Sequence, residues 1–298
     1  ILFDNLGLPE IKKRSTDSSV LEELSVVAPH PIVESIMEYR EQKKLLSTYV
    51  SVLPSLILPK TNRIHTSFIQ WGTATGRLSS RDPNLQNIPI RSENGKKIRA
   101  AFIPGNPENT ILAVDYSQIE LRMLAHLSGD KNLIAAYSND LDIHAQTASA
   151  IYGVSQEEVT SDQRRDAKVV NFGVLYGMTA FRLSRDLKIS RKQAQEFIDG
   201  YFNLYSGVQE FIAKTIVDVH EKGYVETLSG RRRPIPGIFS TDKMECKMAE
   251  RMAVNTPVQG SAADLIKIAM IRISEKIYKE SLPLKMMLQV HDELVFEC

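Results

Sequence analysis

The sequence predicts an α+β fold with long helical segments and a few short strands. Two observations lead to this class. Apolar residues recur at helical spacing over residues 1–50 and again over residues 120–280. Prolines separate short extended runs over residues 51–115, and residues 282–298 contain two apolar runs on either side of a polar turn.

The first two regions are expected to be helical and then extended. Residues 20–27 and 31–53 carry helical periodicity, and Asp17 or the adjacent serines provide a helix start. In the proline-rich region, "RIHTSFIQW" (63–71) and "ILAVD" (111–115) are typical of short strands.

The third region is expected to be mostly helical again. Residues 193–223 and 261–278 have the clearest periodicity, and the basic, proline-rich segment 228–239 interrupts the helices. Near the end of the chain, residues 291–293 ("HDE") lie between two apolar runs, as the turn of a β-hairpin does.

The composition allows a large core but gives no global attraction to a polyanion. The chain has 298 residues, 43% of them hydrophobic, which suits one large or two ordinary domains. Lysine and arginine number 37 against 36 acidic residues, so the net charge is +1. Nucleic-acid binding would depend on local basic segments such as 12–14, 91–99 and 230–234, although such runs are more often solvated surface.

The two cysteines, Cys246 and Cys298, are too few for a disulfide framework, and without paired histidines nearby in the sequence they predict no zinc site. We find no signal-peptide core and no apolar run long enough to span a bilayer. The expected location is therefore intracellular: the cytoplasm and nucleoid if the source is bacterial, with an organelle as the alternative. Both ends of the chain look cut, so we expect a fragment of a longer protein.

Carboxylates follow apolar strands at two places. Asp115 comes directly after the apolar run 111–114, which is expected to be a buried strand, and Asp292 and Glu293 occupy the hairpin turn. Simpler roles exist, since Asp is a common helix N-cap and polar residues are usual in turns. Carboxylates brought together repel unless a cation lies between them, and oxygen ligands of this kind suit Mg²⁺. Two ions about 3.5–4 Å apart can stabilise both reacting oxygens of an in-line phosphoryl transfer.

A candidate nucleotide-binding face lies within residues 164–178. Four side chains spaced by four follow one face of the expected helix: Arg164, Lys168, Phe172 and Tyr176. Two cations followed by two aromatic rings match the phosphates and the base of a nucleoside triphosphate. The alternative is an amphipathic helix with core aromatic residues and solvated basic ones.

Five motifs, in order along the chain, carry a resemblance to a known family. They are "TATGRLSSRDPNLQNIPI" (73–90), "DYSQIELR" (115–122), "RRDAKVVNFGVLYG" (164–177), "NTPVQGSAAD" (255–264) and "QVHDELVFE" (289–297). Over essentially its whole length, the chain resembles the family A DNA polymerases of the bacterial DNA polymerase I type. The resemblance implies a right-hand polymerase with an antiparallel palm sheet, helical fingers and a partial helical thumb. It assigns residues 1–50 to the partial thumb, 51–120 and 255–298 to the palm, and 121–254 to the fingers.

The resemblance also implies roles for the residues that match the motifs. The catalytic residues would be Asp115, Asp292, Glu293 and Lys168, and the metal ligands would be Asp115, Asp292 and the Tyr116 carbonyl. The nucleotide would contact Arg164, Lys168, Phe172, Tyr176, His144, Gln118 and Glu120, the last of these beside the sugar C2′. The DNA would contact Arg77, Arg251, Asn255, Gln259 and His291. Simpler roles stay open, since His144 can begin a helix and Asn255 and Gln259 can cap or bridge loops.

The implied activity is template-directed DNA synthesis, in which a primer 3′-hydroxyl attacks the α-phosphate of a deoxynucleoside triphosphate and pyrophosphate leaves. Two Mg²⁺ ions, which Mn²⁺ can replace, are the implied cofactors. The implied partners of a monomeric enzyme are primer–template DNA and deoxynucleoside triphosphates, with no membrane.

Two alternative functions remain open at this stage. A single-subunit RNA polymerase would use the same aspartates but carry a small residue near the position of Glu120. An inactive nucleic-acid-binding fragment would keep basic grooves without the acidic residues. The sequence also departs from the family pattern, with Trp71 and Gly72 where a more polar lead-in is usual, and it stops after Cys298 while the family pattern continues.

Overall fold

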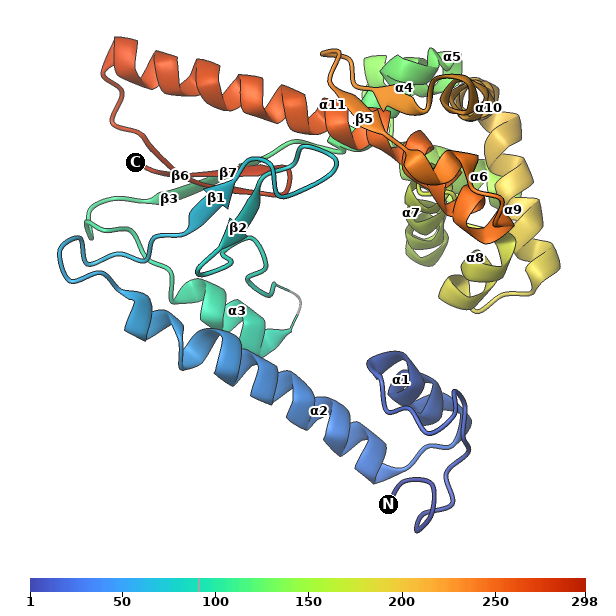
Figure 1. Ribbon diagram of the computed structural model, residues 1–298, viewed down its shortest axis with the longest axis horizontal. Helices are drawn as coiled ribbons and strands as arrows, with labels where there is room; N and C mark the ends of the chain where they lie inside the picture. The colour runs from blue at the N-terminus through green and yellow to red at the C-terminus, as the bar shows by residue number, and fades with distance from the viewer. Residues whose placement is uncertain (91) are drawn as a thin grey trace. The chain divides into compact units, whose positions relative to one another are not determined.

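The computed structural model describes residues 1–90 and 92–298, so Arg91, the first residue of the basic segment 91–99, lies outside the description. Two compact units are present. One contains Ile1–Ser67 and Ser80–Thr110, and the other contains Phe68–Ser79 and Ile111–Cys298. Helices and antiparallel sheets occur together, which confirms the expected α+β class (Figure 1).

The first unit is built mainly from helices. It contains α1 (Ser18–Val27), α2 (Pro31–Leu45), the short helical turns η1 (Leu46–Val50) and η2 (Leu53–Leu56), and α3 (Glu93–Ala100). As expected, Asp17 is the N-cap of α1. The small core of the first unit consists of Leu2, Leu8, Val20, Leu21, Leu24 and Val33. A two-stranded sheet pairs β1 (Ser67–Ile69) with β2 (Ser79–Arg81).

A three-stranded antiparallel sheet lies in the second unit, with the order β3 (Ile111–Asp115), β7 (Glu293–Glu297), β6 (Lys285–Val290). The predicted hairpin is confirmed as β6 and β7. Alternate β7 side chains, Leu294 and Phe296, are buried against residues of the helices α4 and α11. The expectation that residues 111–114 are a buried strand is wrong: within residues 1–90 and 92–298, β3 is an edge strand paired with β7 alone, and its residues are exposed.

Seven helices between β3 and β4 surround the largest core. They are α4 (Ile119–Ser128), α5 (Lys131–Ser138), α6 (Ile143–Tyr152), α7 (Ser161–Leu175), α8 (Ala180–Leu187), α9 (Arg191–Leu204) and α10 (Ser206–Lys222), with the turn η3 (Gln156–Glu158) before α7. The expected helix over 193–223 is interrupted at Tyr205, where ψ is 65°. The Gly207 N–H then donates to the Asp130 carboxylate (2.8 Å), which satisfies one of the open donors at the start of α10.

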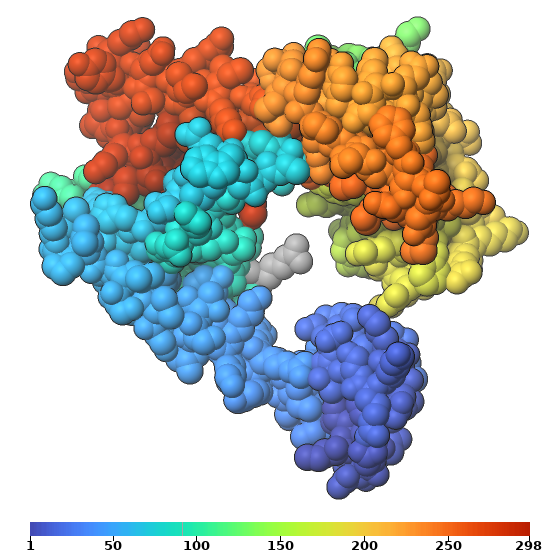
Figure 2. Space-filling model, in the orientation of Figure 1, coloured from blue at the N-terminus to red at the C-terminus, as the bar shows by residue number. Residues whose placement is uncertain are grey.

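The helix expected over 261–278 is much longer than predicted. As α11 it runs from Lys243 to Glu280 and includes Pro257. Before it come the hairpin β4 (Tyr224–Glu226) and β5 (Arg232–Pro234) and the turn η4 (Pro236–Phe239), which share a small core with α10 and α11. The C-terminal half of α11 lies at the surface in Figure 2. No helix among the described residues combines the length and apolar character that a bilayer crossing requires.

Candidate active site

The sheet brings three predicted acidic residues to one end. Asp115 is the last residue of β3 and pairs with Glu293, the first residue of β7. The turn between β6 and β7 contains Asp292, whose carbonyl accepts a hydrogen bond from the Tyr116 N–H (3.0 Å). The helix-capping interpretation of Asp115 is wrong, because α4 begins at Ile119 with Gln118 as its N-cap.

The surroundings of the Asp292 carboxylate disfavour its negative charge. Burial raises its pKa above the ordinary value; Arg77 opposes this shift, and the negative charge of Asp115 adds to it. The buried Oδ1 accepts no hydrogen bond from any described residue. The nearest cation is Arg77, whose Nη2 lies 3.6 Å from Oδ1 and is too distant for a hydrogen bond. This end of the sheet thus holds a buried acceptor beside a second negative charge, which favours binding of a cation.

Glu120 is a buried acid whose two carboxylate oxygens both accept hydrogen bonds. It is only 5% exposed, and its Oε1 accepts a hydrogen bond from Arg77. Tyr176 donates from Oη to Oε2 (2.6 Å) and accepts from Gln259 Nε2 (3.2 Å). Burial and the contact with Glu120 raise the pKa of Tyr176 to about 12, so the phenol stays protonated as the donor. These contacts join the start of α4, the end of α7 and the middle of α11.

The predicted face of α7 is partly exposed and partly core. Arg164 and Lys168 are exposed, and Arg164 donates from Nε to Asp142 Oδ2 (2.6 Å). Phe172 is half-buried against the main core, so the amphipathic-helix alternative accounts for part of its position. Nearby, His144 is 2% exposed, and its Nδ1 lies 2.9 Å from the Asn171 amide. Burial, helped by Arg164 and Lys168, lowers the pKa of His144 to about 4, so its imidazole is neutral at pH 7.

The remaining predicted contact residues are found at three places: on α11, at Gln118 before α4, and in the turn between β6 and β7. Arg251 is exposed and lies against Gly177, where an added Cβ would come 2.8 Å from Arg251 Cγ. The Asn255 Oδ1 is buried without a hydrogen bond from a described residue. The Tyr137 hydroxyl donates to Gln118 Oε1 (3.1 Å). The turn residue His291 is exposed and has a φ of 52°.

Comparison with known proteins identifies the family. The model of DNA polymerase family A matches residues 1–298. The chain belongs to DNA polymerase family A. It is 53% identical over 303 residues to the thermostable DNA polymerase I of Thermus aquaticus and 50% identical over 301 residues to the DNA polymerase I of Bacillus subtilis. Each alignment covers 100% of this chain but 36% and 34% of the relative, so the chain spans about a third of their length.

A solved structure supports the predicted right-hand fold of this family A chain. The polymerase domain of Pol1 from M. smegmatis, in complex with DNA primer-template and dNTP, matches with a TM-score of 0.93 and 41% identity. The match covers 99% of this chain and 52% of that one. It confirms the fold class, an α+β right-hand polymerase, that the five motifs imply.

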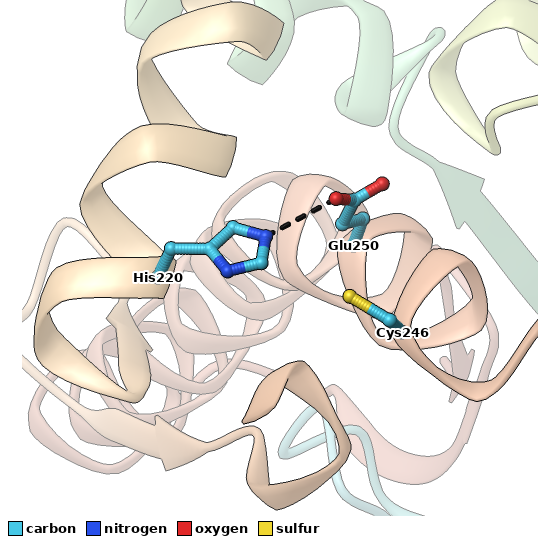
Figure 3. Close-up of side chains that lie close together, drawn as sticks. All are labelled: His220, Cys246 and Glu250. Atoms are coloured by element: carbon cyan, nitrogen blue, oxygen red, sulfur yellow. Dashed lines mark hydrogen bonds and ion pairs between the residues drawn. The ribbon is translucent and has the colours of Figure 1, made fainter. Parts of the chain in front are cut away.

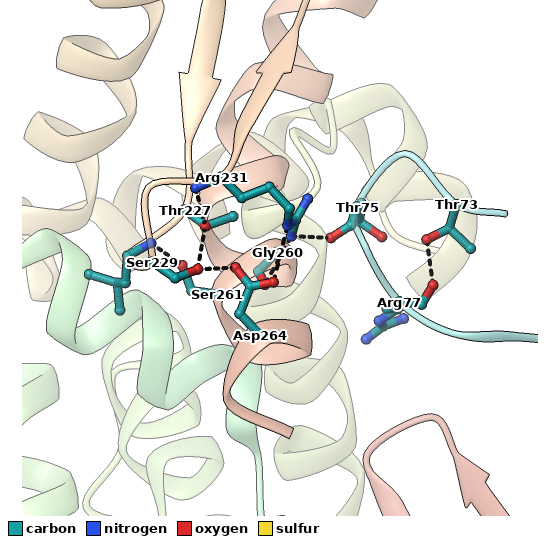
Figure 4. A network of polar contacts seen from close by, with 10 residues as sticks. Thr73, Thr75, Arg77, Thr227, Ser229, Arg231, Gly260, Ser261 and Asp264 are labelled. Atoms are coloured by element: carbon teal, nitrogen blue, oxygen red, sulfur yellow. Dashed lines mark hydrogen bonds and ion pairs between the residues drawn. The ribbon is translucent and has the colours of Figure 1, made fainter. Parts of the chain in front are cut away.

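Sequence reasoning about this family A chain missed a partly buried polar network (Figure 4). Arg231, in the β4–β5 loop, donates from Nη2 to the carbonyls of Thr75 (2.7 Å) and Gly260 (3.3 Å), and from Nε to Asp264 (3.1 Å). Gly76 has a φ of +81°, and a Cβ there would lie 2.5 Å from the Arg231 guanidinium carbon. The network therefore fixes the loop that carries Arg77. Its residues lie in the charge run 230–234 and in two of the five motifs, 73–90 and 255–264, but neither pattern reveals which residues pair.

Proposed function

We propose that this chain catalyses template-directed addition of deoxynucleotides to a primer 3′-hydroxyl, with release of pyrophosphate. Membership of DNA polymerase family A supports the proposal. The observation that carries it is the end of the sheet, where the buried Asp292 Oδ1 accepts no hydrogen bond from the described part of the chain and Asp115 contributes a second negative charge. Such an arrangement is costly without a cation and suits phosphoryl transfer when one is bound.

Asp115, Asp292 and the Tyr116 carbonyl would hold divalent cations, because their hard oxygen atoms are the donors that Mg²⁺ prefers. When bound, two such ions would lower the pKa of the attacking hydroxyl and stabilise charge on the leaving phosphate. Glu293, paired with Asp115 across β3 and β7, would support this acidic group. Arg77, already close to Asp292, would position the carboxylate and contact the primer end.

The exposed cations of α7 would bind the triphosphate. Arg164 and Lys168 lie one turn apart, so both can reach a single polyphosphate, and Lys168 would donate a proton to the departing pyrophosphate. Because His144 is neutral, it would contribute a hydrogen bond and no positive charge. Phe172 and Tyr176, farther along α7, would contact the sugar and the base.

Glu120 would select the sugar, and five other residues would bind DNA. With both oxygens fixed by Arg77 and Tyr176, the Glu120 side chain cannot easily swing away from an added 2′-hydroxyl. The proposed DNA contacts are Arg77, Arg251, Asn255, Gln259 and His291, and Gln118 would act beside the nucleotide. We also propose the division into partial thumb (1–50), palm (51–120 and 255–298) and fingers (121–254), in which α11 runs from fingers to palm.

Primer extension by an Asp292→Asn variant tests the proposal. The change keeps the side-chain shape but removes a charge, so extension should fall by on the order of 10³-fold while primer–template affinity stays close to wild type. Asp199→Asn, on an exposed part of α9, is the matched control and should extend normally. Extension by Asp292→Asn within about threefold of wild type would show that the carboxylate assignment is wrong.

A further inference from the structure

A second group of potential metal ligands lies on α10 and α11. His220, Cys246 and Glu250 each offer a ligand atom, and these atoms all lie within 4.8 Å of one another. His220 Nε2 and Glu250 Oε1 are 3.1 Å apart. In Figure 3 the imidazole reaches from α10 toward the thiol and the carboxylate of α11.

The local fold holds the two helices in this arrangement. Cys246 and Glu250 are four residues apart on α11 and therefore lie on one face, while His220 is in the last turn of α10. The residues that precede His220 and Glu250 in the sequence, Val219 of α10 and Ala249 of α11, are fully buried in a shared core. The ligand-bearing backbone is thus fixed before any ion binds, and only side-chain rotations remain.

The chemistry of the three donors distinguishes this group from the carboxylates of the sheet. Imidazole nitrogen, thiolate sulfur and carboxylate oxygen are the usual ligands of Zn²⁺, at about 2.0–2.3 Å in tetrahedral geometry. Mg²⁺ takes oxygen ligands almost exclusively. Among the described residues, the Cys246 thiol has one hydrogen-bond partner, the Ile238 carbonyl at 3.5 Å, so it can rotate toward the other two ligands at the cost of one weak hydrogen bond.

We propose that His220, Cys246 and Glu250 form a zinc site that joins the end of α10 to the first part of α11. Zinc binding converts the Cys246 thiol to a thiolate and releases its proton to solvent, and water completes the coordination. The sequence does not predict this site, because its ligands come from two separate helices.

Cobalt substitution tests thiolate ligation directly. The chain is titrated with Co²⁺ in excess Mg²⁺, which occupies oxygen-only sites, and sulfur-to-cobalt charge-transfer absorption is recorded. Wild type and the matched control Cys298→Ser should show the absorption. Added Zn²⁺ should displace the Co²⁺ and abolish the absorption. Cys246→Ser should lose it and bind Zn²⁺ at least about 100-fold more weakly. Absence of the band in wild type, or its persistence in Cys246→Ser, would overturn the proposal.

Thiol labelling gives a second measurement that does not depend on polymerase activity. Zn²⁺ should slow alkylation of Cys246 at least about tenfold and leave the exposed Cys298 unchanged, as read by peptide mass spectrometry. Equal alkylation of Cys246 with and without Zn²⁺ would contradict the site. Without added Zn²⁺, Cys246→Ser should keep its circular dichroism and its primer extension, which separates loss of the ion from loss of the fold.

Discussion

Replacing Glu120 by alanine tests how this chain would distinguish deoxyribonucleotides from ribonucleotides. Glu120 is buried and accepts hydrogen bonds from Arg77 and Tyr176. Glu120→Ala removes the volume that would exclude a 2′-hydroxyl. It also releases Arg77, whose nearest other acid is Asp292 at 3.6 Å. We therefore expect weaker sugar discrimination together with a lower rate, because Arg77 would compete with metal ions for Asp292.

The magnitudes follow from these contacts. Loss of a steric block should raise ribonucleotide incorporation relative to deoxynucleotide incorporation at least about tenfold, or about 1.4 kcal/mol of transition-state energy. Hydrogen bonds to charged groups contribute about 1.5–3 kcal/mol each, but Arg77 is partly exposed and its share is reduced by solvent screening. The free energy of unfolding should therefore fall by about 2–3 kcal/mol.

The assay is single-nucleotide primer extension with matched ribo- and deoxynucleotides, at several Mg²⁺ concentrations. Glu120→Ala should need more Mg²⁺ for half-maximal rate than wild type. Glu196→Ala, at an exposed ion pair with Lys192 on α9, is the control, and its ribonucleotide discrimination should stay within about threefold of wild type. An unchanged ratio in Glu120→Ala would remove Glu120 from the sugar pocket and restore the RNA polymerase alternative.

Three further changes probe the rest of the site. Lys168→Ala should lower kcat/KM for the nucleotide on the order of 10²-fold in single-turnover kinetics, whereas Arg165→Ala, which removes an exposed ion pair with Asp162, should have little effect. The pKa of His144 is about 4 in the folded chain, whereas a histidine in the unfolded chain has a pKa of about 6.5. As the pH falls below about 6.5, His144 is therefore protonated in the unfolded chain before the folded one, which lowers the free energy of unfolding. Wild type should therefore lose, between pH 6.5 and 4, on the order of 2 kcal/mol more unfolding free energy than His144→Gln, measured in urea. Arg231→Met should lower both thermal stability and extension rate, while Arg232→Met, at an exposed ion pair, should change neither; equal behaviour of these two variants would refute the positioning role of Arg231.

Short-range patterns predicted much of the fold because they depend on chain geometry alone. Alternation and turn chemistry located β6 and β7, and helical periodicity located α7, α9, α10 and the C-terminal half of α11. Periodicity failed where a distant side chain sets a helix end. Tyr205 interrupts the run 193–223, and Asp130, remote in sequence, accepts the hydrogen bond from Gly207 that starts α10.

The chemistry of the candidate site was readable from motifs, whereas its pairings required the folded chain. Residue types and order indicated acids at strand ends and a basic, aromatic helix face, because these features depend on spacing within one element. Glu120 could have paired with Arg122, two residues away, yet its partner is Arg77 from another segment, and Arg122 lies 4.4 Å from the Tyr137 ring centre. The edge position of β3 and the closeness of His220 to Cys246 also result from contacts between segments that are distant in the sequence. Such contacts depend on how whole elements pack, and a single sequence holds no local signal for that.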